Sequence, residues 1–309
     1  MNMNTEPATG FLRFNGLTEQ DLPVAEREGL RDASRIVVKM GTSSLTHPNG
    51  RLNLKKIDQL ARIMTDLENA GKRMVLVSSG AIGCGMTRLG MRERPTALKD
   101  KQAAASVGQG LLMEIYQKSF SDFHQNIAQI LLTKDVFSNT IKSSNARDTF
   151  DTLFELGIIP IVNENDSIST DEILEECFGD NDILSAMTAE MVGADALLIL
   201  SDVDGLYDSN PMENEEARLI PSVIKITPDI MRSAGSSATR FGTGGMSTKI
   251  GAAHYATRRG INTVIASGED VRNVYRILDG CNVGTIFFRN QDSGKQESGN
   301  NSDGTVKEN

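Results

Sequence analysis

Two glycine-rich segments near opposite ends of the chain each place a lysine beside glycines and hydroxyl groups. The first is Val38-Lys39-Met40-Gly41-Thr42-Ser43, and the second is Gly242-Thr243-Gly244-Gly245-Met246-Ser247-Thr248-Lys249. Glycine lets backbone N–H groups approach an anion closely, and lysine adds a positive charge that can follow a phosphoryl group. Either segment alone is also typical of an ordinary turn, but together they predict phosphoryl transfer.

The common nucleotide-binding signatures do not explain these lysines. Neither segment fits G-x-x-x-x-G-K-[ST], no G-x-G-x-x-G opens a helix, and neither HRD nor DFG occurs. The P-loop, dinucleotide-binding and protein-kinase classes are therefore excluded. The nucleotide site must have another design.

Composition limits the class of protein and its partners. The 309 residues are 39% hydrophobic, which is enough for one large domain or two small ones. A net charge of −9 without a basic run argues against nucleic acid or an anionic membrane as the main partner. Three cysteines without C-x-x-C spacing fit neither a disulfide framework nor a zinc site. With no signal peptide and no apolar run of ~18 residues, a cytoplasmic protein is expected.

Short β-branched runs alternate with longer helical patterns, which is typical of a mostly parallel sheet with helices on both faces. One helix is predicted from an Asn53 cap to Gly71, and another over residues 101–119, whose small side chains suit close helix packing. The predicted strands are 36–38, 74–77, 127–132, 158–162, 196–200 and 262–265. Residues 1–34 are expected to be an extension with a short helix near 19–30, and residues 290–309 a disordered tail.

Polar clusters follow these strands, where ligands bind in such sheets. The clusters are residues 39–44, 78–81, 163–166, 179–182, 201–207 and 242–249. In this order, and together with Asn145-Ala146-Arg147-Asp148-Thr149, they resemble the glutamate 5-kinases of the amino acid kinase family. The resemblance covers residues 35–289 and implies one kinase domain, a three-layer α/β/α sandwich with a substrate half and a nucleotide half.

The resemblance also implies the reaction. The γ-phosphoryl group of ATP would pass in line, without a covalent enzyme intermediate, to the γ-carboxylate of L-glutamate. The product would be glutamyl 5-phosphate, the first intermediate of proline synthesis. A carboxylate is already a nucleophile, so catalysis needs alignment and charge neutralisation rather than a general base. Mg²⁺ is expected with ATP, held mainly by phosphate oxygens and by no direct protein ligand.

By resemblance, Lys39 and Lys249 would neutralise phosphate charge, and Asp182 would orient their two ammonium groups. A solvated loop lysine and a helix N-cap are the alternatives for these residues. The residues expected to bind the acceptor are Ser79, Asp166, Asn181, Asn163 and Asp180. Those expected to bind ATP are Lys39, Gly41, Ser201, Asp202, Thr243, Gly244, Gly245, Met246, Ser247, Thr248 and Lys249.

The resemblance further suggests proline as a feedback inhibitor, glutamyl phosphate reductase as the pathway neighbour, and a homo-oligomer. Residues 170–178 would be a loop contacting glutamate and the inhibitor, or else a solvated acidic face. Many members continue into a PUA module, whereas this chain ends soon after Phe288. The alternatives are a kinase for N-acetylglutamate, aspartate or a nucleoside monophosphate, and a non-catalytic amino-acid sensor, which would have no reason to keep both lysines.

Overall fold

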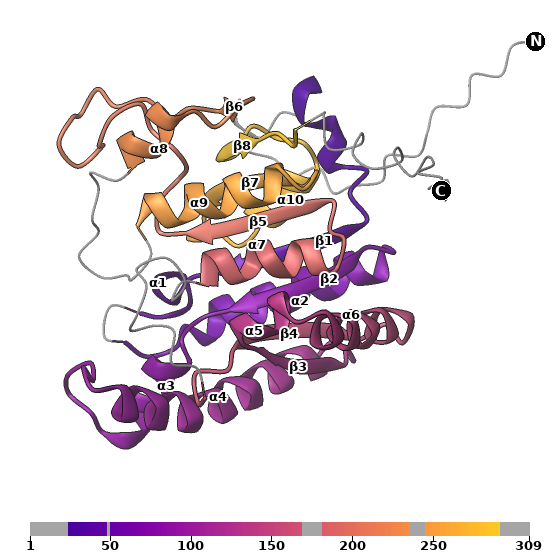
Figure 1. The fold of residues 1–309 in the computed structure, drawn as a ribbon, viewed down its shortest axis with the longest axis vertical. Coiled ribbons are helices and arrows are strands. Elements are labelled where there is room, and N and C mark those ends of the chain that lie inside the picture. Colours follow the sequence, from indigo (N-terminus) through magenta and orange to yellow (C-terminus); the bar gives the residue numbers. More distant parts are fainter. Residues whose placement is uncertain (1–23, 48–49, 169–180, 235–244, 291–309) are drawn as a thin grey trace, which may run out of the picture.

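One eight-stranded sheet with helices on both faces makes up the computed structural model, which describes residues 24–47, 50–168, 181–234 and 245–290 (Figure 1). The strand order is β3-β4-β2-β1-β5-β7-β8-β6. The strands are β1 (Arg35–Met40), β2 (Arg73–Ser78), β3 (Ile127–Leu132), β4 (Ile159–Glu164), β5 (Ala196–Ser201), β6 (Ser222–Val223), β7 (Asn262–Ser267) and β8 (Thr285–Phe287). Strand β8 runs antiparallel to β7, and the other pairs are parallel.

The six predicted strands and the mostly parallel sheet are confirmed. The helices are α1 (Thr42–Leu45), α2 (Leu54–Asn69), α3 (Ala81–Leu89), α4 (Leu98–Ser121), α5 (Lys134–Ser138), α6 (Thr140–Glu155), α7 (Asn181–Met191), α8 (Pro228–Ala234), α9 (Met246–Thr257) and α10 (Asn273–Leu278). Helix α2 begins as predicted, because the Asn53 side chain accepts a hydrogen bond from the Lys56 N–H at 3.1 Å. It ends before Gly71, whose φ of 91° suits glycine.

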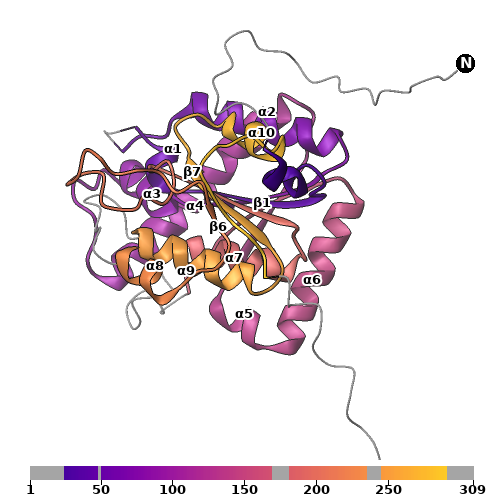
Figure 2. The same ribbon diagram turned by 90° about the horizontal axis from the view of Figure 1, so that it is seen from above.

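Alternate residues of the central strand β1 face opposite layers of the sandwich. Ile36, Val38 and Met40 are buried in the core shared with α2, α4 and α10. Val37 is buried in the second core, with α6, α7 and α9 (Figure 2). Since side chains alternate along a strand, Lys39 lies on the same face as Val37. The sequence of β1 therefore directs this lysine toward α7 and α9.

Helices α3 and α4 pack so closely that two glycines are required at their contact. A Cβ atom on Gly85 would lie 1.8 Å from the carbonyl oxygen of Ala104. A Cβ atom on Gly108 would lie 1.8 Å from the carbonyl oxygen of Ala81. Such distances are far inside van der Waals contact, so α4 is held directly against the first turn of α3. The small residues predicted to allow close packing do so here.

A buried arginine ties the segment before β1 to the other end of the domain. Arg27 lies in a 3₁₀ helix, η2 (Ala25–Leu30), and only 2% of it is exposed. Its guanidinium group donates to the carbonyl oxygens of Cys281, Val283, Gly284 and Pro221 at 2.5 to 3.0 Å. These carbonyls precede β8 and β6, so the segment before β1 is joined to the starts of these two strands.

Candidate active site

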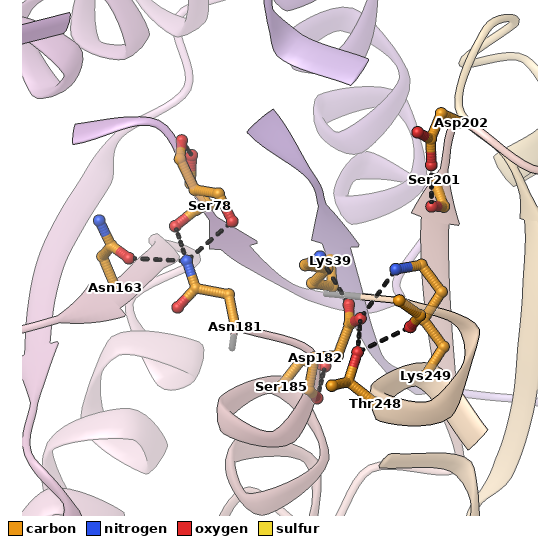
Figure 3. A network of polar contacts seen from close by, with 12 residues as sticks. Lys39, Ser78, Asn163, Asn181, Asp182, Ser185, Ser201, Asp202, Thr248 and Lys249 are labelled. Carbon is orange, nitrogen blue, oxygen red and sulfur yellow. Dashed lines mark hydrogen bonds and ion pairs between the residues drawn. The ribbon is translucent and has the colours of Figure 1, made fainter. Parts of the chain in front are cut away.

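Two lysines from distant segments converge on one buried carboxylate. Lys39 is the last residue but one of β1, and its Nζ lies 2.5 Å from Oδ1 of Asp182. Lys249 lies in α9, and its Nζ is 3.1 Å from Oδ2 of the same residue. Figure 3 shows Asp182 between the two ammonium groups. Helix α7 begins at Asn181, so Asp182 lies in the first turn of this helix. The Asp182 side chain forms ion pairs with both lysines.

Thr248 completes this cluster on the side of α9. Its hydroxyl oxygen lies 3.4 Å from Oδ2 of Asp182 and donates to the carbonyl oxygen of Gly245 at 2.8 Å. Gly245 is the N-cap of α9, and Met246 and Ser247 form its first turn. The start of this helix, with N–H groups that lack partners within the helix, therefore lies beside the lysine pair.

The lysine and aspartate cluster is almost inaccessible to water. Asp182 is 0% exposed, Lys39 4% and Lys249 5%. Burial raises the pKa of Asp182, but the charges of Lys39 and Lys249 and their hydrogen bonds more than offset this, so the pKa lies below its ordinary value. The carboxylate stays ionised, and the three side chains keep one positive charge in excess. A cluster of this kind attracts a polyanion such as a triphosphate.

The acceptor residues predicted from the sequence form a second cluster beside the first. The Asn181 amide nitrogen Nδ2 donates toward Oγ of Ser79 at 2.8 Å and toward Oδ1 of Asn163 at 3.0 Å. Asp182 follows Asn181 directly, so the two clusters meet at the first turn of α7 (Figure 3). Ser79 lies between β2 and α3, and Asn163 lies near the end of β4.

The remaining predicted residues lie at the carboxyl ends of the strands, in or near the two clusters, or fall outside the described residues. Asp166 lies in a turn after β4, beside Ser167, whose hydroxyl group is 2.8 Å from that of Ser106 in α4. Gly41 follows β1 and is the N-cap of α1. Ser201 is the last residue of β5, and its hydroxyl group donates to Oδ1 of Asp202 at 2.8 Å. In Figure 3 these two residues lie on the same side as Lys249. Asp180, Thr243, Gly244 and the acidic segment 170–178 lie outside the described residues.

Two features of the site were missed by reasoning from the sequence. Gln109 of α4 accepts a hydrogen bond from Nδ2 of Asn163 at 2.8 Å. Gly268 follows β7, and its N–H donates to the carbonyl oxygen of Ser201 at 2.6 Å. A glutamine in a helix of small residues carries no motif, and a Ser-Gly pair after a strand suggests only a turn. The signal available for Ser267-Gly268 was its place at the carboxyl end of a predicted strand.

Among the residues that the structure describes, no three His, Cys, Asp or Glu side chains gather as a metal ion would require. Within the same residues, no helix combines the length and apolar character needed to cross a membrane.

Comparisons with known proteins identify the family of this chain. Residues 34–267 match the amino acid kinase family. The chain is 50% identical over 262 residues to a glutamate 5-kinase of Clostridium perfringens, covering 84% of this chain and 97% of the relative. It is 47% identical over 272 residues to a glutamate 5-kinase of Moorella thermoacetica, covering 88% and 70% of the two chains.

A solved structure shares the fold at much lower sequence identity. The UMP kinase from Bacillus anthracis has a TM-score of 0.56 and is 14% identical, with 83% of this chain and 96% of that chain covered. This likeness supports the fold alone, whereas the identities of 47–50% carry the assignment to a family. The chain belongs to the amino acid kinase family and, within it, to the glutamate 5-kinases.

Proposed function

We propose that this protein transfers the γ-phosphoryl group of ATP to the γ-carboxylate of L-glutamate, giving L-glutamyl 5-phosphate for proline synthesis. The observation that carries the proposal is the convergence of Lys39 and Lys249 on Asp182, one residue from Asn181. Charge-neutralising groups and acceptor-recognising groups are then neighbours, as a direct transfer between two bound substrates requires. The similarity to glutamate 5-kinases supports the choice of substrates.

The lysine pair supplies the electrostatic part of this reaction. In phosphoryl transfer, negative charge spreads over the oxygens of the moving group, and positioned cations stabilise it. Asp182 forms ion pairs with two ammonium groups that would otherwise repel each other. It thereby keeps both lysines ready before the nucleotide arrives, and less reorganisation is needed during the reaction.

The acceptor needs orientation more than activation. A carboxylate is ionised at neutral pH, so no side chain has to remove a proton from it. Ser79, Asn163 and Asn181 provide neutral donors and acceptors, which suit a substrate carrying both carboxylate and ammonium groups. In this proposal Asp166, which lies in the turn after β4, binds the α-ammonium group.

Mg²⁺ belongs to this proposal as a companion of ATP. It binds nucleotides mainly through phosphate oxygens and retained waters, so the few carboxylates at this site are compatible with it. Asp182 is held by two lysines, which makes it a poor direct ligand. The metal would neutralise phosphate charge together with the lysine pair.

The decisive experiment traps the acyl phosphate. Purified protein is incubated with ATP, Mg²⁺, L-glutamate and hydroxylamine, which converts an acyl phosphate to a hydroxamate. We expect γ-glutamyl hydroxamate with glutamate and little product in matched reactions with aspartate or N-acetylglutamate. Absence of product with glutamate would refute the proposal, and product with another acid would reassign the substrate. Addition of proline to the same assay tests the expected feedback inhibition.

A further inference from the structure

Backbone groups fix the direction of the hydrogen bonds around Asn163. The N–H of Glu164 donates to Oδ1 of Asn163 at 2.9 Å, and a backbone N–H can only donate. The oxygen of this amide is therefore identified, and its nitrogen faces the other way. That nitrogen donates to Oε1 of Gln109 at 2.8 Å. Asn163 is 3% exposed and Gln109 9%, so water is a poor substitute for this acceptor.

A second backbone group fixes the amide of Asn181. Its Nδ2 lies 3.0 Å from the carbonyl oxygen of Ser78, which can only accept. The same nitrogen faces Oδ1 of Asn163 and Oγ of Ser79. The oxygen of Asn181 consequently points away from these partners (Figure 3). Ser79 accepts in this bond and keeps its own hydroxyl hydrogen available for donation.

Helix α4 places Gln109 with little freedom to shift. The neighbouring Gly108 touches the start of α3 at Ala81, two residues after Ser79. Two turns further along α4, the hydroxyl group of Tyr116 lies 2.8 Å from that of Ser78. Both ends of this stretch of α4 are thus fixed to the turn that carries Ser79. Gln109 therefore lies on a stretch of α4 that contacts both sides of Ser79 in the sequence.

We propose that Gln109 is a positioning residue for the acceptor substrate, acting through Asn163. By accepting from Nδ2 of Asn163, it keeps Oδ1 of Asn163 directed at the Asn181 amide, so that the nitrogen of Asn181 points toward Asn163 and Ser79. Ser79 then presents a donor to a carboxylate, and the oxygen of Asn181 presents an acceptor to an ammonium group. This inference rests on the proposed function, because an amino acid acceptor is what this polarity recognises.

The test compares two substitutions at Gln109 with a matched control. Gln109→Met keeps the length of the side chain but removes the acceptor. We expect it to raise KM for glutamate by ~10-fold or more, as loss of a partner for a buried donor does, and to change KM for ATP less than two-fold. Gln109→Glu keeps an acceptor oxygen and should bring KM for glutamate to within about three-fold of the original. Gln117→Met makes the same change on the exposed side of α4 and should alter neither constant.

A double-mutant cycle distinguishes positioning from general damage. In an Asn163→Ala background, Gln109→Met should change KM for glutamate less than two-fold further, because the residue it acts through is gone. Additive effects would overturn the inference, as would equal impairment by Gln109→Met and Gln109→Glu. An unchanged KM in an active Gln109→Met enzyme would also overturn it while leaving the proposed function intact. An inactive unmodified protein would instead reject the proposed function.

Discussion

At the scale of single residues, the site combines two buried lysines with one buried carboxylate. An isolated buried ammonium group is costly, but Lys39 and Lys249 share a carboxylate that is itself fully buried. Removing either lysine takes away the excess positive charge, and removing Asp182 leaves two buried ammonium groups without their shared carboxylate, so the three should behave as a unit in kinetics. Either lysine is therefore an informative residue to replace.

We predict that Lys249→Met lowers kcat by ~10²-fold or more while ATP binding changes little. The lysine is assigned to charge that develops during transfer, and loss of such a stabilising group usually has this effect. The measurement is steady-state kinetics together with calorimetric titration of ATP. Lys225→Met is the control, because Lys225 is exposed, and it should leave turnover unchanged. A Lys249→Met enzyme with normal turnover would contradict the role.

Cys84 gives a prediction about pH. Burial raises the pKa of this thiol to about 11, above its ordinary value of 9.0. At pH 8 its thiolate fraction, and hence its alkylation by iodoacetamide, should be about 100-fold below that of an ordinary thiol. Because the folded-state pKa is raised, the linked stabilisation is present below pH 9 and lost as pH rises toward 11. Peptide mass mapping of timed alkylation checks the rate, and rapid labelling at pH 8 would contradict it.

The predictable residues were those that stand in motifs. Lys39, Asp182 and Lys249 carry charge beside glycines or helix starts, and the structure brings these three together. Gln109 could not be found in this way, since its role depends on an amide nitrogen 54 positions along the chain. A hydrogen bond between such distant residues has no local signature.

At the scale of elements, the α3–α4 contact brings helix α4 directly against the first turn of α3. Periodicity predicted α2 and the six longer strands, because each repeats its pattern over several residues. It could not predict β6 and β8, which have two and three residues. No local pattern predicts that β8 runs antiparallel to β7, because the direction of a strand depends on its place in the whole sheet.

Two alanine substitutions in α4 should have opposite effects on stability. Gly108→Ala places a methyl group 1.8 Å from the backbone of Ala81, and we expect it to lower the free energy of unfolding by about 3 kcal/mol. Gly110→Ala meets nothing within 4 Å, and it should raise that free energy by about 0.5 kcal/mol, because alanine favours helix. Urea denaturation followed by circular dichroism measures both. Equal effects would show that the helices can separate without loss.

At the scale of the whole molecule, one sheet carries both halves of the site. Strand β1 lies near its centre, Ser79 and Asn163 lie on one side of it, after β2 and on β4, and Ser201 lies on β5 on the other side. Arg27 also joins the segment before β1 to the starts of β8 and of the edge strand β6.

Replacing Arg27 should weaken the whole domain. Arg27→Ala leaves four carbonyl oxygens without this donor, and we expect the free energy of unfolding to fall by about 3 kcal/mol. Arg31→Ala removes an exposed side chain that donates to Asp279, and it should cost less than about 1 kcal/mol. Urea unfolding of both variants makes the comparison. A larger loss for Arg31→Ala than for Arg27→Ala would refute this view of the segment.

The contact between Arg27 and the carbonyl of Cys281 joins residues 254 positions apart. A ribosome adding ~5–20 residues per second needs roughly 10–50 s to deliver the second partner after the first has emerged. Throughout that interval the guanidinium group stays hydrated while the earlier strands already have neighbours with which to pair. The link between residues 24–34 and the start of β8 therefore forms only after residue 284 has been synthesised, and chains released before that point would lack it.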